Sequence, residues 1–252
     1  MTKAQIAGEL KQLGLAAGDL VLVHSSLSSL GCVEGGPEAV IDALIEVLGP
    51  EGTLLMPSFQ RGGEHALLRQ GCVFDLRTSP SEMGLITETF RRRPEVRRSI
   101  SPTHCTAAWG GRAEEILAGH QYCSVSVGKG SPYHRVVEWG GKILFLGVTH
   151  TCNTTLHFVE NTNGAPTICP ELFRPMVIDL DGRCWVVPMY AHLPGPPRRY
   201  ARVEDDLLSA GVQVNGPVGE ATARLVDAQA MGEIIGGKIR KDPLYLIEVF
   251  RP

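Results

Sequence analysis

The sequence predicts an α/β fold: a single domain over residues 1–252, with a central mixed sheet flanked by helices plus a β-hairpin. Strand-like runs alternate with helix-like runs over residues 1–150, which is typical of parallel crossover connections. Two later strand-like runs are joined by Asp181-Gly182, a dipeptide that favours a hairpin turn. Hydrophobic residues make up 43% of the chain and charged residues 20%, so we expect a substantial core.

The first half of the chain begins the strand–helix alternation. Apolar runs predict strands over Asp19–His24 and Thr53–Pro57. The helix between them, Pro37–Leu48, has proline in its first turn and is followed by glycine. Ser79 and Glu82 predict a capping box that starts a helix running to about Arg92.

The remaining elements follow from the same patterns. The segment Ser99–Gly110 is predicted as a loop and strand. Helices are predicted over the N-terminal segment, Ala113–Ala118, Tyr133–Glu138, Val203–Ala210 and Gly219–Met231, and strands over Lys142–Val148, the two arms of the hairpin in Met176–Tyr190, and Leu244–Phe250.

Charge and cysteine content narrow the class of protein. A net charge of −3 argues against nucleic acid or an anionic membrane as the main partner. No stretch has the length of a membrane-spanning helix, and the N-terminus lacks a signal-peptide core. Seven cysteines without regular spacing indicate a reducing compartment, so we expect a cytoplasmic protein with a small-molecule partner. The oligomeric state stays open, a homodimer included.

The segment Lys142–Glu160 carries the strongest chemical pattern. A buried strand leads through a polar loop into a helix, the place where α/β proteins hold reactive groups. His157 and Glu160 lie three residues apart on one helix face, and Asn153 or Thr154 is a plausible N-cap. The positive helix end disfavours a charged imidazole, so His157 is a candidate general base. The alternative is a solvated surface pair.

Other motifs are less specific. The serines that follow the Asp19–His24 strand offer hydroxyls and backbone N–H groups to a phosphate or a thioester oxygen, although an ordinary serine-rich turn has the same composition. Neither Gly31–Gly36 nor Gly128–Ser131 matches a nucleotide-binding motif, and no G-x-S-x-G elbow is present. A zinc site from His104, Cys105, His150 and Cys152 would match no common spacing.

Several segments, in this order, resemble the signature segments of the aminoglycoside 3-N-acetyltransferase family, also called the antibiotic N-acetyltransferases. The resemblance covers nearly the whole chain. The segments are VHSSLSSLGCVEGG (Val23–Gly36), Phe74–Ser99, Gly128–Val148, NTTLHFVE (Asn153–Glu160), Gly216–Ala228 and Arg240–Ile247.

The resemblance implies a reaction and a set of roles. The family uses acetyl-CoA to acylate the 3-amino group of a 2-deoxystreptamine ring, and its fold differs from the GNAT fold. By this resemblance His157 is the general base, Glu160 orients it or contacts the aminoglycoside, and no metal is expected. The resemblance also assigns the thioester arm of the cofactor to His24, Ser25, Ser26 and Leu27, the same groove to Arg98 and Ser99, and a substrate ammonium to Asp75. Thr155 is a further candidate substrate contact, because its hydroxyl or that of Thr154 could stabilise the oxyanion that develops.

Two segments depart from the family pattern. The family usually has S-x-H-P where this chain has Ser99-Ile100-Ser101-Pro102, so a histidine is missing and His104 is a candidate substitute. The loop Ala191–Tyr200 contains Arg198 and Arg199 and no acid, and cationic side chains are poor neighbours for a polycationic sugar. We take His192 in this loop as an ordinary loop histidine.

The departures leave three rivals to aminoglycoside acetylation. The first is acyl transfer from acyl-CoA to a less cationic amine. The second is a zinc-dependent hydrolase, and the third is a CoA-binding relative that has lost catalysis. Other candidate acids for a cationic substrate are Glu64, Glu204, Asp205 and Asp206, the last three of which are expected to be solvated surface acids.

Overall fold

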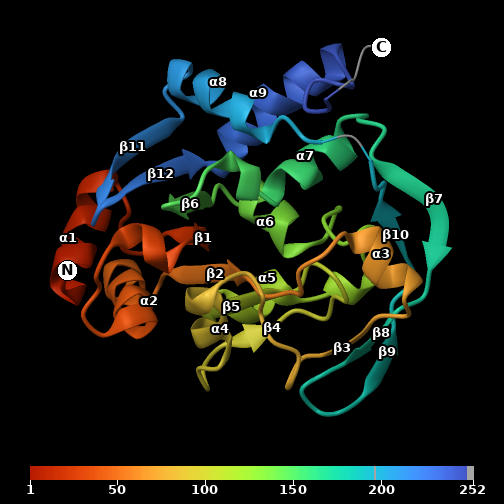
Figure 1. Ribbon diagram of the computed structural model, residues 1–252, viewed down its shortest axis with the longest axis horizontal. Coiled ribbons are helices and arrows are strands. Elements are labelled where there is room, and N and C mark those ends of the chain that lie inside the picture. Colours follow the sequence, from red (N-terminus) through yellow and green to blue (C-terminus); the bar gives the residue numbers. More distant parts are fainter. Residues whose placement is uncertain (196, 249–252) are drawn as a thin grey trace.

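The computed structural model describes residues 1–195 and 197–248, and its core is a seven-stranded mixed sheet in the order β11-β12-β6-β1-β2-β5-β4 (Figure 1). The three central strands are parallel to one another, and the flanking strands are antiparallel to their neighbours. The strands are β1 (Leu20–Ser25), β2 (Thr53–Pro57), β4 (Arg97–Arg98), β5 (Thr106–Gly110), β6 (Lys142–Leu146), β11 (Gln213–Val218) and β12 (Ala221–Asp227).

Helices cover both faces of the sheet because successive strand residues point to opposite sides. In β1, Val21 and Val23 pack into one core with α1 (Lys3–Leu13), α2 (Gly36–Leu48) and α4 (Leu85–Arg91). Leu20 and Leu22 pack into the other core. That core includes α5 (Ala113–Leu117), α6 (Pro132–Glu138), α7 (Thr155–Thr162), α8 (Val203–Ser209) and α9 (Ala228–Lys241).

Smaller sheets and short helices frame the loops at one end of the central sheet. Strand β7 (Ile168–Phe173) pairs with β10 (Met189–His192), and β3 (Val73–Asp75) joins the hairpin of β8 (Met176–Ile178) and β9 (Cys184–Val186). The remaining helices are α3 (Glu64–Arg69) and the 3₁₀ turns η1 (Leu27–Leu30), η2 (His120–Tyr122), η3 (His150–Cys152) and η4 (Tyr200–Arg202).

The parallel pairing of β1 with β6 places the two most polar loops side by side. Ser25 lies opposite Leu146 at the ends of these strands, and the Ser26 amide donates to the Leu146 carbonyl. The serine turn that follows β1 and the turn that leads to α7 therefore leave the sheet together. The carboxyl ends of parallel strands are where open α/β sheets hold ligands.

Four predicted elements differ from the structure in whole or in part. The helix predicted from Ser79 begins only at Leu85, because the Ser79 hydroxyl accepts from the Asp75 amide instead of capping a helix. The segment predicted as a helix over Gly219–Met231 is strand β12 followed by α9; the alternating burial of Ala221, Ala223 and Leu225 shows the strand period.

The predicted C-terminal strand, Leu244–Phe250, is also wrong where the structure describes it. Leu244 lies in a turn, and Ile247 makes an isolated bridge to Arg198. Phe250 lies outside the described residues. The hairpin around Asp181-Gly182 is confirmed, but Met189 and Tyr190 belong to β10, which pairs with β7 rather than continuing the hairpin.

Candidate active site

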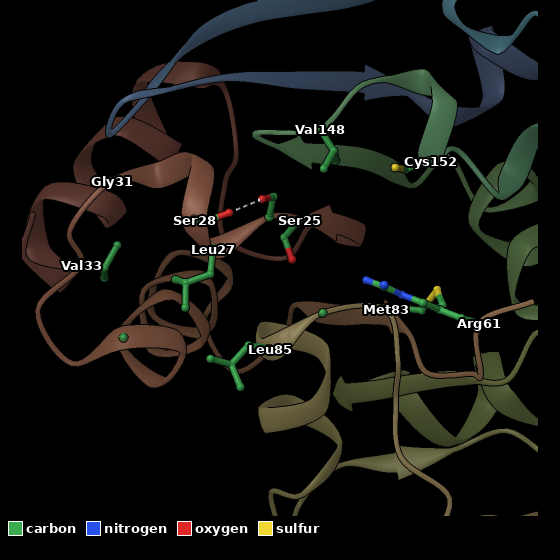
Figure 2. A pocket seen from close by; sticks show the side chains of 13 residues that line it. Ser25, Leu27, Ser28, Gly31, Val33, Arg61, Met83, Leu85, Val148 and Cys152 are labelled. Carbon is green, nitrogen blue, oxygen red and sulfur yellow. Dashed lines mark hydrogen bonds between the residues drawn. The ribbon is translucent and has the colours of Figure 1, made fainter.

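A cavity of about 620 Å³ lies between the serine turn after β1 and the turn before α4 (Figure 2). Three of the four predicted cofactor residues of that turn, Ser25, Ser26 and Leu27, line it. Both apolar and polar side chains line it, and Arg61 supplies a cation. The other lining residues are Ser28, Gly31, Val33, Gly36, Met83, Gly84, Leu85, Val148 and Cys152.

A narrower cavity of about 160 Å³ continues toward the core and shares Ser25, Met83, Val148 and Cys152 with the larger one. His24 lines it, stacked on Phe145 with ring centroids 5.4 Å apart. Its Nε2 is buried without a hydrogen-bond partner in the described part of the chain. Burial, and to a smaller extent His150, lower the pKa of His24 to about 3, so this imidazole is neutral.

On the other side of the α7 N-terminus is a third cavity, of about 310 Å³. Thr154, just before α7, lines the narrow cavity, while His157, in its first turn, lines this one. The helix start therefore lies between two spaces that could hold two reactants. The third cavity is otherwise lined by Gly62, Gly63, Glu64, His65, Ala66, His104, His192, Leu193, Pro194, Gly195 and Arg198.

His157 and Glu160 meet as predicted, and Tyr200 joins them. The Tyr200 hydroxyl donates to Glu160 Oε2 over 2.6 Å and lies 2.8 Å from His157 Nδ1, which is itself 3.2 Å from Glu160 Oε2. Since the tyrosine proton goes to the carboxylate, Nδ1 carries a proton and donates. The lone pair of the neutral ring is then on Nε2, which makes no hydrogen bond with the described residues.

Protonation of this pair follows from its surroundings. Burial, aided by the neighbouring His192, lowers the pKa of His157 to about 4 against the opposing pull of Glu160. Burial alone would raise the pKa of Glu160, but the bonds to His157 and Tyr200 and the charge of Arg198 lower it instead. At neutral pH the imidazole is uncharged and the carboxyl group is ionised.

Arg198 is the cation that balances Glu160. Its Nε lies 3.1 Å from Glu160 Oε1, and the carboxylate side chain is 0% exposed. An ionised carboxylate at that depth requires such a partner. The arginine that the sequence showed in the acid-free loop therefore compensates the carboxylate that orients His157.

A second buried carboxylate, Glu64, organises the opposite wall of the third cavity. Its Oε1 accepts from Thr103 over 2.7 Å and lies 3.2 Å from His104 Nδ1. Its Oε2 accepts from both the amide (2.7 Å) and Nδ1 (2.5 Å) of His192. Burial would raise the pKa of Glu64, but His104 and His192 hold it well below the usual range. His192 is thus a buried member of the site and not an ordinary loop histidine.

Arg98 and Ser99 do not line the 620 Å³ cavity that contains the serine turn. The Arg98 guanidinium is buried and donates to the carbonyls of Leu76, Ser79 and Ser58. Ser99 is buried too, where its hydroxyl accepts from the Thr106 amide and meets His120 Nδ1 at 2.8 Å. Both side chains connect neighbouring loops through buried hydrogen bonds to main-chain groups. Leaving such groups buried without a partner would cost free energy of folding.

Two of the predicted substrate contacts also lie apart from the three cavities. Asp75 is held by Arg77, with 2.8 Å between Oδ2 and Nη2, and this partner lowers its pKa to about 2. The Thr155 side chain is 0% exposed and its hydroxyl has no partner among the described residues. Thr154 is the threonine of this turn that reaches a cavity.

The four residues of the considered zinc site are not together either. Cys105 is buried with its thiol donating to the Ser99 carbonyl, and His150 bonds to Gln213 over 2.8 Å. Cys152 lines the 620 Å³ cavity. No metal-ligating cluster within residues 1–195 and 197–248 includes Cys105, His150 or Cys152. In the same residues, no helix has both the length and the apolar character needed to cross a membrane.

Sequence reasoning missed Tyr200 and the linkage of Glu64 with His192. A tyrosine at the end of a proline-rich loop has no local spacing relative to His157, 43 residues earlier. The sequence did contain one signal for His192. This histidine stands at the end of an apolar run that predicts a strand, and a β-bulge at such a place can turn a side chain from one face of the strand to the other. The register of β10 does shift between Tyr190 and His192.

The chain is similar to known proteins in both sequence and structure. Residues 22–236 match the family model described as aminoglycoside 3-N-acetyltransferase. The chain is 36% identical over 247 residues to aminoglycoside N(3)-acetyltransferase IV of Salmonella sp, covering 97% of this chain and 90% of that protein.

Solved structures are similar over nearly the full chain. Aminoglycoside acetyltransferase AAC(3)-IVa in complex with a gentamicin superposes with a TM-score of 0.84 at 34% identity, covering 98% of this chain and 92% of that one. The binary complex of AAC-IIIb with CoASH has a TM-score of 0.84 at 27% identity, covering 100% and 99%. These relatives and the shared fold identify the chain as an α/β enzyme of the group-transfer class. The chain belongs to the aminoglycoside 3-N-acetyltransferase family.

Proposed function

We propose that this protein transfers the acetyl group of acetyl-CoA to the 3-amino group of a 2-deoxystreptamine aminoglycoside. The observation that carries the proposal is the neutral His157, oriented by Glu160 and Tyr200, at the helix start between the two sets of cavities. Relatives of the same reaction class, one with bound CoASH and one with bound gentamicin, support it.

His157 acts as the general base in this proposal. An amine attacks a thioester only as its free base, so the ammonium of the acceptor must lose a proton. Nε2 of a neutral imidazole can take it, while the Nδ1 proton stays on the Glu160–Tyr200 side. Glu160 stabilises the imidazolium that forms, as the carboxylate of a catalytic triad does.

The residues of the larger cavity fit the shape and charge of the cofactor. Leu27, Val33 and Met83 offer apolar contact to the pantetheine arm, and Arg61 offers a cation to a phosphate. The buried, unpartnered Nε2 of His24 lines the narrow cavity beyond. A hydrogen-bond donor there, or the Thr154 hydroxyl, would stabilise negative charge that develops on the thioester oxygen.

The charge of the third cavity favours one rival. Both carboxylates near it already have partners: Glu160 pairs with Arg198, and Glu64 is hydrogen-bonded to His192, Thr103 and Ser126. A polycationic sugar gains most from carboxylates whose oxygens are not already engaged. A less cationic amine as acceptor is therefore the second candidate function.

The expected result of the deciding experiment is thiol release from acetyl-CoA that depends on gentamicin or apramycin. The same protein is incubated with acetyl-CoA and each of a set of amines, and the products are examined by NMR for acetylation at the 3-amino position. Simple monoamines serve as the matched controls. Faster release with monoamines than with any aminoglycoside would favour the rival, and release with no amine tested would contradict both functions.

Resistance to aminoglycosides and a cytoplasmic location belong to the same proposal. Acetylation removes a positive charge from the drug, a change that weakens binding to any polyanion. All seven cysteines are free in the structure, which suits a reducing compartment.

Replacing Tyr200 by phenylalanine is expected to lower kcat about tenfold with little change in the KM for acetyl-CoA. The hydroxyl donates to Glu160 and accepts from His157, so its loss leaves the imidazole less well oriented. A hydrogen bond to a charged group contributes about 2 kcal/mol, and the free energy of unfolding should fall by a similar amount.

Tyr245 provides a matched control for this variant. Its hydroxyl also donates to a carboxylate, Asp206, at a place remote from the three cavities. Tyr245→Phe should lower the free energy of unfolding and leave kcat unchanged. Equal kcat values in the Tyr200→Phe variant and the unaltered protein would remove Tyr200 from the site.

A further inference from the structure

Three metal-ligating side chains from distant parts of the chain meet in the wall of the third cavity. They are Glu64 at the start of α3, His104 in the loop before β5 and His192 at the end of β10. One ligand atom from each lies within 4.8 Å of the others. We propose that these residues form a site for a divalent transition-metal ion of the zinc type, and that metal bound there inhibits acetyl transfer.

The donor set and its spacing favour zinc-type ions. Two imidazoles and one carboxylate, with an open position toward a cavity, are the ligands of many zinc sites. Zinc bonds of about 2.0 Å in tetrahedral geometry place ligand atoms about 3.3 Å apart. His104 Nδ1 and Glu64 Oε1 are already 3.2 Å apart, and His192 Nδ1 has to move outward from its 2.5 Å contact with Glu64 Oε2.

The surroundings already orient the ligands. The exposed fractions of the three side chains are 5% for Glu64, 12% for His104 and 8% for His192. Thr103 and Ser126 donate to Glu64 Oε1, as outer groups do around metal-binding carboxylates. Little side-chain freedom would therefore be lost on binding a metal.

Binding would rearrange protons in a defined way. Nδ1 of His192 now donates to Glu64, and Nδ1 of His104 faces Glu64 and a Ser126 hydroxyl whose own proton goes to Glu64. Coordination through the two Nδ1 atoms therefore requires each proton to leave or to move to Nε2. Nε2 of His192 lies 3.0 Å from the Asn161 amide nitrogen. Metal binding should then turn the Asn161 side chain so that its oxygen accepts from Nε2.

The effect on transfer rests on the proposed function. The His157 ring centroid is 4.5 Å from that of His192 and 6.1 Å from that of His104. A divalent cation between those histidines would repel a cationic acceptor from the third cavity. It would also disfavour the second positive charge that His157 acquires when it accepts the proton.

A second cluster of ligating groups, His65, Cys169 and Glu171, does not make an equivalent site. Its carboxylate already pairs with Arg69, with 2.6 Å between Nη2 and Oε2. That glutamate is also exposed. A metal ion would have to displace the arginine and would remain open to water.

Cobalt titration of chelator-treated protein tests the site directly. Co²⁺ is expected to bind with one equivalent and to give the visible absorption of a tetrahedral N/O complex, which Zn²⁺ then abolishes. His104→Ala should weaken Co²⁺ binding on the order of 100-fold, since loss of an outer-shell partner alone costs about 10–100-fold. The matched control is His134→Ala. His134 also lies near a carboxylate, with 3.8 Å between its Nε2 and Glu138 Oε1, but it belongs to no cluster of three ligating groups among the described residues, so its loss should leave Co²⁺ binding unchanged.

Inhibition is measured separately. Zn²⁺ should raise the KM for the amine at fixed acetyl-CoA, and a chelator should restore it. Glu64→Gln removes the charge at the centre of the buried network, so a loss of metal binding in that variant could come from the network rather than from the ligand. The deciding variant is therefore His104→Ala, and its melting temperature has to equal that of the unaltered protein. Absence of one-equivalent Co²⁺ binding, or binding that His104→Ala leaves intact, would overturn the site. Cobalt binding tests the metal site even if no amine is acetylated. A failure of the proposed function can therefore be told apart from a failure of the metal site.

Discussion

Replacing His157 by alanine is expected to lower kcat by about 10²–10⁴-fold, the usual contribution of a general base. The imidazole is neutral at the pH of the reaction because burial lowers its pKa to about 4. Its Nδ1 is held by Glu160 and Tyr200, so Nε2 alone is available for the proton of the amine. Steady-state thiol release with saturating acetyl-CoA measures the effect.

The variant should keep its fold and its affinity for acetyl-CoA. His157 lines the third cavity and does not line the two cavities assigned to the cofactor, so calorimetric binding of acetyl-CoA is the matched measurement. In the unaltered protein the transfer rate should fall only below about pH 5, as His157 becomes protonated near pH 4. A kcat within about twofold of normal in His157→Ala would remove this residue from the mechanism.

The sequence predicted the parts of the site that are close along the chain. His157 and Glu160 share one helix face through a spacing of three residues, and the serine turn follows directly from a buried strand. The reaction and the cofactor were predicted from the resemblance to a known family, because the spacing of residues alone indicates neither. In contrast, Tyr200 is placed by the packing of η4 against the other elements, and no local rule connects it to α7.

Errors arose where a local pattern met a tertiary contact. Ser79 is a residue type that often caps a helix. In the structure, however, the Arg98 guanidinium, which can only donate hydrogen bonds, binds the main-chain carbonyls of Ser79 and Leu76. That contact and the bond from the Asp75 amide hold Ser79 in a loop. The family resemblance assigns Arg98 to the cofactor groove. Its partners in the structure are main-chain carbonyls of loops distant in the sequence, and no sequence pattern shows such contacts.

Burial of three neutral histidines should make the protein markedly less stable in mild acid. Burial lowers the pKa values of His24 to about 3 and of His120 and His157 to about 4, against 6.5 for an ordinary histidine. Below about pH 6.5 the unfolded chain binds these protons and the folded protein does not. Stability is therefore present above about pH 6.5 and is lost as the pH falls. His24, His120 and His157 together account for about 4 kcal/mol of this loss between about pH 7.5 and 5.5, and His150, whose pKa burial also lowers, adds to it.

Denaturant unfolding at the two pH values measures this loss, and His120 offers the matched control. His120 lies outside the three cavities, where it contacts Ser99 and donates from Nε2 to the Ser126 carbonyl. His120→Gln should lower stability at about pH 7.5, because a buried hydrogen bond is weakened, yet it should reduce the pH-dependent loss by about a third. Glu64 and Glu160, whose pKa values are lowered, add a further loss only below about pH 4.5. A free energy of unfolding that stays constant over this pH range would mean that these histidines take up protons as readily in the folded protein as in the unfolded chain, and burial would then not lower the pKa of His157.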